Sequence, residues 1–318
     1  MAENTLLGGH FMRSFPSNPM IRDCRAAKRK PSIPLQILIF FLVFLIPTIL
    51  SGFLIAIPAV ILSVVHSGTN PETILSSPSM TIVNLFMTIL TTGAALLYCL
   101  CIEKRSLRSM GLGKGSFLKS YGKGLLIGTG LLLVCCGISW LFGGFRVSFP
   151  CTLTPVYFLL FFLGFVIQGS SEEILLRGYF MMSLSNRCTA AWAVGLSSVL
   201  FSLLHIFNPG FGLLPLVNIA LFGVFMGLYV FREGDLWGAC AIHTAWNFVQ
   251  GNILGIQVSG GAVTPTLWQF KPTAGMELLN GGAFGIEASV VVTVVLSVAC
   301  AWTYFSKKQR NAPTDREI

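Results

Sequence analysis

Residues 157–184 read YFLLFFLGFVIQGSSEEILLRGYFMMSL, and this stretch decides which kind of fold the chain can adopt. It is long and apolar enough to cross a membrane, whose hydrocarbon core takes about 20 residues of helix. It also holds Glu172, Glu173 and Arg177. A charged side chain in hydrocarbon costs several kcal/mol unless it is paired or neutralised. Partners for these three charges must therefore come from elsewhere in the fold.

The composition of the whole chain is that of a membrane protein. Of its 318 residues, 54% are hydrophobic and only 10% are charged, whereas about 25% of the residues of a soluble domain are charged. The mean hydropathy is +0.77. A water-soluble fold of this size could not bury so much apolar surface, so we expect an integral membrane protein whose partners include membrane lipids.

The charge and the cysteines argue against two other classes of protein. The net charge is +9, but the basic residues flank apolar segments and do not alternate with aromatic residues. We therefore predict no nucleic-acid partner. The nine cysteines form no CxxC pair, and most lie in apolar runs. Neither a disulfide framework nor a zinc finger is expected.

The apolar segments predict an all-α fold, a polytopic integral membrane protein with about eight transmembrane helices. The candidate spans are 36–64, 80–102, 123–143, 157–184, 189–208, 212–231, 235–254 and 284–306. On this count every Lys and Arg except Arg146 and Lys271 lies on one side of the membrane. Because positive residues remain on the cytoplasmic side, both termini are predicted to be cytoplasmic, and the membrane is expected to be the plasma membrane.

Ionisable side chains inside spans indicate function by default. Glu173 and Arg177 are four residues apart with the glutamate first, so Arg177 can neutralise Glu173. Glu172 points about 100° away around the helix and is free of that arginine. We expect the fourth span to lie at about 160–184 rather than 157–184. This shift places Arg177 inside the membrane, beside Glu173 and away from water.

Two more helix faces carry polar residues at the same spacing. Phe201 and His205 share one face, and His243 and Asn247 share another. Each feature has an ordinary structural explanation, such as a satisfied core histidine, a packed phenylalanine or an interhelical hydrogen bond from asparagine. Their occurrence together on three spans, with few other buried charges, favours a functional site.

These residues form three ordered motifs, EExxxR (Glu172, Glu173, Arg177), FxxxH (Phe201, His205) and HxxxN (His243, Asn247). The motifs resemble those of the CAAX prenyl protease type II and bacteriocin-processing family of intramembrane proteases, the CPBP or Abi family. The resemblance covers about residues 155–255. It implies a hydrolase, an intramembrane endopeptidase that cleaves membrane-associated or prenylated (CAAX-type) polypeptides.

The resemblance also implies roles for single residues. Glu172 would be the general base that activates water together with His205. His243 and Asn247 would stabilise the oxyanion of the tetrahedral intermediate. Glu173 and Arg177 would hold the site together, with Phe201 as structural support.

The cofactor stays open at this point. The family name includes metalloprotease, and Glu172, His205 and His243 could supply the three protein ligands of a catalytic zinc. The glutamate mechanism needs no cofactor. The absence of an HExxH motif argues against a zincin-like site.

Two other functions compete with the peptidase. A proton-coupled membrane transporter could use the same buried Glu and His residues as a relay, and a catalytically silent member could act as a membrane scaffold or immunity protein. The complete set of motifs favours the peptidase. The oligomeric state is not indicated.

The predicted spans, the tails and the motif-bearing core together divide the chain into five regions. These are a basic cytoplasmic tail (1–35), N-terminal transmembrane helices with a basic connecting surface segment at 103–123 (36–150), a CPBP/Abi-like catalytic helical core (151–256), an outer loop with the last transmembrane helix (257–306) and a cytoplasmic tail (307–318).

Overall fold

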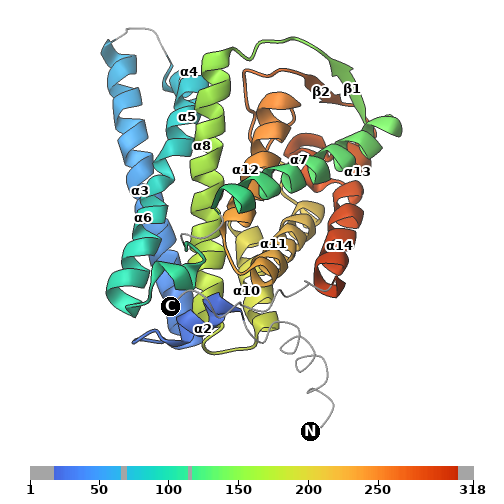
Figure 1. The fold of residues 1–318 in the computed structure, drawn as a ribbon. Helices are drawn as coiled ribbons and strands as arrows, with labels where there is room; N and C mark the ends of the chain where they lie inside the picture. Colours follow the sequence, from blue (N-terminus) through green and yellow to red (C-terminus); the bar gives the residue numbers. More distant parts are fainter. Residues whose placement is uncertain (1–17, 66–69, 114–116, 307–318) are drawn as a thin grey trace.

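The computed structural model describes residues 18–65, 70–113 and 117–306, and this part of the chain is mostly helical (Figure 1). The predicted cytoplasmic tail at 307–318 and the first half of the predicted N-terminal tail lie outside the described residues. In Figure 1 helices α3, α6 and α8 stand upright, and α7 crosses the other helices obliquely.

Eight helical segments occupy the positions of the eight candidate spans. They are α3 (Ile33–Val65), α5 and α6 (Pro78–Met87 and Ile89–Leu97) with the π-helical η1 (Tyr98–Glu103), α7 (Phe117–Leu141), α8 (Pro155–Glu173) with the π-helical η3 (Ile174–Met181) and α9 (Met182–Leu184), α10 (Ala190–Leu203), α11 (Leu213–Glu233), α12 (Trp237–Phe248) with the π-helical η4 (Val249–Ile253), and α14 (Val290–Phe305). Within the described part of the chain, five of these segments are long and apolar enough to cross a membrane, those of α3, α5–η1, α7, α8–α9 and α11. The helical, multi-pass character of the prediction is thus supported, and the count of eight spans stays a prediction.

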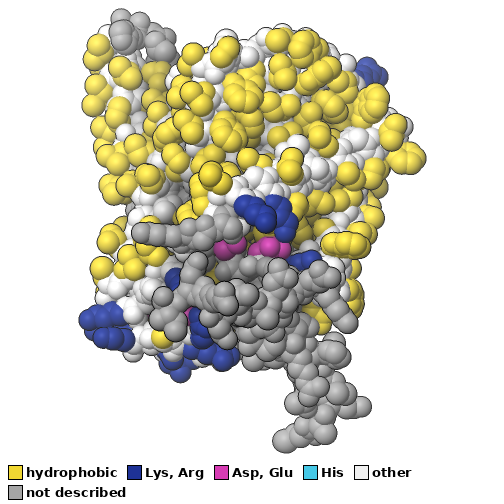
Figure 2. Space-filling model, in the orientation of Figure 1, with side chains coloured by type: hydrophobic (Ala, Val, Ile, Leu, Met, Phe, Trp, Pro, Cys, Tyr) yellow, Lys and Arg dark blue, Asp and Glu magenta, His cyan; other side chains and the backbone are white. Residues whose placement is uncertain are grey.

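The outer surface also fits contact with lipid. Hydrophobic side chains cover most of the upper part of the face in Figure 2, and Lys and Arg lie mainly in its lower half. On α3 large apolar side chains such as Leu38, Ile46 and Phe53 are exposed. A surface of this kind would be unfavourable in water and is expected where helices face hydrocarbon.

Short elements occur where the sequence predicted tails and loops. Helix α2 (Pro19–Arg25) lies in the predicted N-terminal tail, and its Met20 and Cys24 are fully buried. Strands β1 (Phe145–Ser148) and β2 (Gln269–Pro272) pair antiparallel, so the fold is not strictly all-α. The other short elements are α4 (Pro71–Leu75), η2 (Leu107–Met110), α13 (Glu277–Asn280), η5 (Gly282–Phe284) and η6 (Ile286–Ala288).

Helix α8 and its continuation carry the first motif. The Thr154 side chain accepts a hydrogen bond from the Tyr157 N–H, and Pro155 lies in the first turn, as is typical of a helix start. The helix therefore begins at Pro155. The expected membrane span of about 160–184 lies within this helix and its continuation and stays a prediction. The protein itself buries Arg177 completely.

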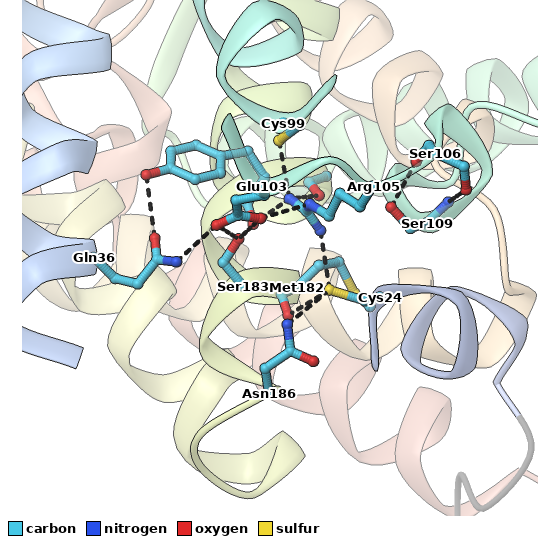
Figure 3. A network of polar contacts seen from close by, with 12 residues as sticks. Cys24, Gln36, Cys99, Glu103, Arg105, Ser106, Ser109, Met182, Ser183 and Asn186 are labelled. Carbon is cyan, nitrogen blue, oxygen red and sulfur yellow. Dashed lines mark hydrogen bonds and ion pairs between the residues drawn. The ribbon is translucent and has the colours of Figure 1, made fainter. Parts of the chain in front are cut away.

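From Ile174 to Met181 the helix is π-helical, a conformation that often marks functional sites. A buried network holds this segment in place (Figure 3). Arg105 Nε lies 2.8 Å from Glu103 Oε2, and both side chains are buried. Arg105 Nη2 also donates hydrogen bonds to the backbone carbonyls of Gly178 and Tyr179. The guanidinium thus binds the backbone of the segment that carries the motif arginine.

The same network, which we call the Glu103 network, joins further helices to α9. Gln36 of α3 donates to Glu103 Oε1 at 2.7 Å, and the Ser183 hydroxyl donates to both Glu103 oxygens at 2.9 Å. Arg105 Nη1 donates to Cys24 Sγ of α2 at 3.1 Å. The prediction that residues 103–123 form a surface segment is therefore wrong at its start, because Glu103 and Arg105 neutralise each other inside the protein.

Close helix packing positions the third motif. Helix α12 packs against both α7 and α8. A Cβ atom on Gly124 of α7 would lie 2.3 Å from the Gly238 carbonyl oxygen, and one on Gly128 would lie 2.5 Å from the Ile242 carbonyl oxygen. A Cβ atom on Gly169 of α8 would lie 3.0 Å from the Thr244 nitrogen. Glycine therefore lets these backbones approach closely, which places α12 directly beside the glutamates of α8.

Candidate active site

Glu173 joins two of the three motifs. Its Oε1 lies 2.9 Å from Arg177 Nη1 and 2.9 Å from His243 Nδ1. The predicted i,i+4 pair is thus present, and the structure adds His243 as a second partner of the same oxygen. Because a carboxylate only accepts hydrogen bonds, His243 carries a proton on Nδ1, and its Nε2 faces away from Glu173.

Glu172 faces a different set of groups. Its Oε1 accepts a hydrogen bond from Gln168 Nε2 at 2.5 Å. Its Oε2 lies 3.6 Å from His243 Nε2, which is too far for a hydrogen bond. That oxygen is buried and has no hydrogen-bond partner among the described residues. Glu172 therefore keeps one carboxylate oxygen available beside an imidazole nitrogen.

Phe201 connects the second motif to the other two. The guanidinium carbon of Arg177 lies 4.7 Å from the centre of the Phe201 ring, within the range of a cation–π contact. The ring also meets His205 and His243 edge-on, with centroid distances of 5.0 and 6.0 Å. Phe201 thus contacts residues of all three motifs, which fits the role of structural support that the resemblance implied.

His205 is held by its own helix. Its Nδ1 lies 2.9 Å from the Phe201 carbonyl oxygen. Since a carbonyl only accepts, the neutral ring carries its proton on Nδ1, and Nε2 is left as an acceptor. His205 is partly exposed and lines the same cavity as Glu172.

That cavity has a volume of ≈ 260 Å³ and brings together side chains from all three motifs. Glu172, His205, His243 and Asn247 line it, with apolar walls that include Phe222 and Trp246, whereas Glu173 and Arg177 are not among its lining residues. The structure thus brings together the four groups predicted to act on substrate. The two predicted supporting charges lie behind them in the protein.

Two residues of this cavity were missed in the sequence. Gln168 lies between Glu172 and Asn247 and bonds to both, since Asn247 Nδ2 donates to Gln168 Oε1 at 2.9 Å. Its spacing of one helical turn before Glu172 is the signal that could have revealed it. Glu287 is the other, and no local motif marks it.

Glu287 fixes part of the predicted outer loop over the cavity. Its Oε2 accepts hydrogen bonds from the Ser259 N–H at 2.5 Å and Gln250 Nε2 at 3.0 Å, and its Oε1 accepts from the Ser259 hydroxyl at 3.1 Å. The segment around Ser259 forms one wall of the cavity.

The structure gives the zinc hypothesis no support. No group of three or more His, Cys, Asp or Glu side chains within the described ranges is placed to hold a metal ion. A zinc site would need its ligands about 2.0–2.2 Å from one metal ion. The zinc site stays an untested prediction, and no catalytic step below passes through a metal.

Comparison with known proteins agrees with the motifs. Residues 154–249 match the family model described as type II CAAX prenyl endopeptidase Rce1-like. No curated protein and no solved structure matches the chain. The matched segment runs from the cap of α8 to the end of α12 and contains every motif residue from Glu172 to Asn247. The resemblance in the motifs is therefore confirmed over residues 154–249, the part of the chain that is similar to this family.

Proposed function

We propose that the protein is an intramembrane endopeptidase that cleaves membrane-associated or prenylated (CAAX-type) polypeptides, with Glu172 as the general base. One observation carries the proposal. The buried Glu172 Oε2 has no hydrogen-bond partner among the described residues, and it lies in a cavity beside His243 Nε2. A buried carboxylate oxygen without a partner is costly unless something binds it, and a water molecule in the cavity is a suitable donor.

The first step is the activation of that water. Glu172 Oε2 accepts one proton of the water, and His205 Nε2 is the second acceptor in the same cavity. The water oxygen then forms a bond to the carbonyl carbon of the scissile amide. When the tetrahedral intermediate collapses, the carbon–nitrogen bond breaks and Glu172 returns its proton to the leaving amine.

The negative oxygen of the intermediate needs hydrogen-bond donors. Asn247 uses one N–H of its amide for Gln168 and retains a second N–H for the substrate. His243 can donate from Nε2 only as the imidazolium, because its Nδ1 proton is bound to Glu173. Glu172 and Glu173 lie on either side of that ring, so a positive His243 would have a carboxylate at each nitrogen.

The family match and the apolar surroundings support the class of substrate. The matched family is that of type II CAAX prenyl endopeptidases. Aromatic walls such as Phe222 and Trp246 suit an apolar peptide segment or a lipidated tail that enters from the bilayer. We further propose a plasma-membrane location with both termini in the cytoplasm.

A cleavage assay tests this proposal. Purified protein in nanodiscs is incubated with a prenylated CAAX peptide and with the same peptide lacking the lipid, with no ion gradient. We expect a defined carboxyl-terminal fragment, lost in Glu172→Gln and in His205→Ala but retained in Glu72→Gln, which alters an exposed glutamate of α4. Gradient-dependent uptake into sealed vesicles without any cleavage would instead identify a transporter.

A further inference from the structure

Gln168 is the centre of a hydrogen-bonded chain that links the general base to the oxyanion donor. It lies one helical turn before Glu172 on α8, is partly buried, and lines the catalytic cavity. Its Nε2 donates to Glu172 at 2.5 Å, and its Oε1 accepts from Asn247 Nδ2 at 2.9 Å. The amide thus spans two helices that carry different motifs.

The direction of these bonds follows from the chemistry of the end group. An ionised carboxylate has no proton to donate, so the NH₂ group of Gln168 must face Glu172. Its carbonyl oxygen then faces Asn247, so Asn247 must donate a hydrogen bond from its NH₂ group. If the Asn247 amide were turned over, two carbonyl oxygens would face each other, and no proton would lie between them.

This direction matters because Asn247 is useful to the reaction only in one orientation. An oxyanion needs an N–H, and the amide oxygen of Asn247 would repel it. The charge on Glu172 therefore sets the orientation of Asn247 through Gln168. Glu173 is bound instead to Arg177 and His243 through its Oε1.

We propose that Gln168 is a positioning residue that orients the Asn247 amide toward the substrate. This inference rests on the peptidase function proposed above. Gln168 is required because no other side chain of the described residues is hydrogen-bonded to both Glu172 and Asn247.

The test uses Gln168→Leu and Gln168→Met, which keep an apolar body of similar size and remove both hydrogen bonds. The matched control is Ser171→Ala on the same helix, which removes the bond from Ser171 Oγ to the Thr88 carbonyl outside the cavity. Thermal unfolding in detergent confirms that each variant is folded. The kinetic constants are then measured on the peptide that the wild type cleaves.

We expect kcat to fall by about tenfold or more in both Gln168 variants, less than the roughly 10²–10³-fold loss for removal of an oxyanion donor, with KM nearly unchanged. Adding Asn247→Ala to Gln168→Leu should cost no more than Asn247→Ala alone, because Gln168 acts through that amide.

Several results would overturn the proposal. Unchanged kcat in both folded Gln168 variants would do so, and so would a rise in KM alone, which indicates a substrate contact. Losses that multiply in the double variant would show that the two residues act independently. A wild type that cleaves no peptide refutes the endopeptidase itself and this role with it, whereas active wild type with unaffected variants refutes only the role of Gln168.

Discussion

Glutamine substitutions at the adjacent residues Glu172 and Glu173 are expected to have opposite effects on stability and activity. Glu173 is fully buried, and its Oε1 is bound by Arg177 and His243. Glu172 has a side chain that is 31% exposed, and its Oε2 is buried without a hydrogen-bond partner among the described residues. Glutamine keeps the shape of either side chain, removes the charge and replaces one acceptor oxygen with an NH₂ donor.

The magnitudes follow from the partners. Glu173→Gln leaves the buried Arg177 charge without its counterion, and such a loss costs about 3–5 kcal/mol, a large part of the total stability of a typical domain, about 5–15 kcal/mol. One glutamine oxygen can still accept from one neighbour, so the lower end of that range is expected. Glu172→Gln weakens one hydrogen bond and removes an uncompensated charge, so its net effect on stability is expected to lie within about 1 kcal/mol.

Thermal unfolding in a single detergent, together with peptide cleavage, measures both effects. Glu173→Gln should lower Tm by roughly 6 °C or more. Glu172→Gln should leave Tm close to that of the control Glu72→Gln and reduce kcat by about 10²-fold or more, as expected for loss of a general base. Replacing both Glu173 and Arg177 with leucine should be less harmful than Glu173→Leu alone, because no unpaired charge remains.

Equal loss of Tm in Glu172→Gln and Glu173→Gln would refute this division of roles. So would a fully active Glu172→Gln protein.

Four further predictions concern packing, the Glu103 network, metal and topology. Gly128→Ala should lower the free energy of unfolding by about 1–3 kcal/mol, because its Cβ would lie 2.5 Å from the Ile242 carbonyl oxygen. The control Gly130→Ala on the same helix has nothing within 4 Å of the added carbon and should be neutral or stabilising. Equal Tm values for the two variants would contradict this prediction. Arg105→Leu should lower the free energy of unfolding by about 3–5 kcal/mol, because it leaves Glu103 buried and unpaired. The control is Arg108→Leu, at an exposed arginine, and an equal loss of stability in the two variants would show that the Glu103 network adds little. Peptidase activity should survive treatment with a strong chelator. If the chelator instead removes stoichiometric zinc and activity together, and added zinc restores the activity, the metal site is supported. Reporter fusions after residues 30 and 310 should be cytoplasmic and one near residue 270 external, so a cytoplasmic reporter near 270 would break the eight-span count.

The sequence was enough to identify the class of protein and the residues of the three motifs. Composition alone requires a membrane environment, because no soluble core could bury so much apolar surface. The pairing of Glu173 with Arg177 could be derived because it is local, being set by the helical repeat. The motif resemblance supplied the remaining site residues, and the match over 154–249 supports it.

Several features could not be derived in this way. The Glu103–Arg105 pair looked like part of a charged surface connection, since nothing local shows that α2, α3 and α9 close around it. Burial of Arg177 was expected to come from the depth of its span in the membrane. In the structure the protein itself buries Arg177.

Only the tertiary structure decided which oxygen of which glutamate is available. His243 lies beside both Glu172 and Glu173, and Gln168 connects Glu172 to Asn247, because α12 packs closely against α8 through glycines. Helical periodicity shows which side chains share a face of one helix, but contacts between helices depend on the distance and rotation at which those helices pack. Those quantities are set by side chains far apart in the sequence, so the catalytic geometry arises only in the folded protein.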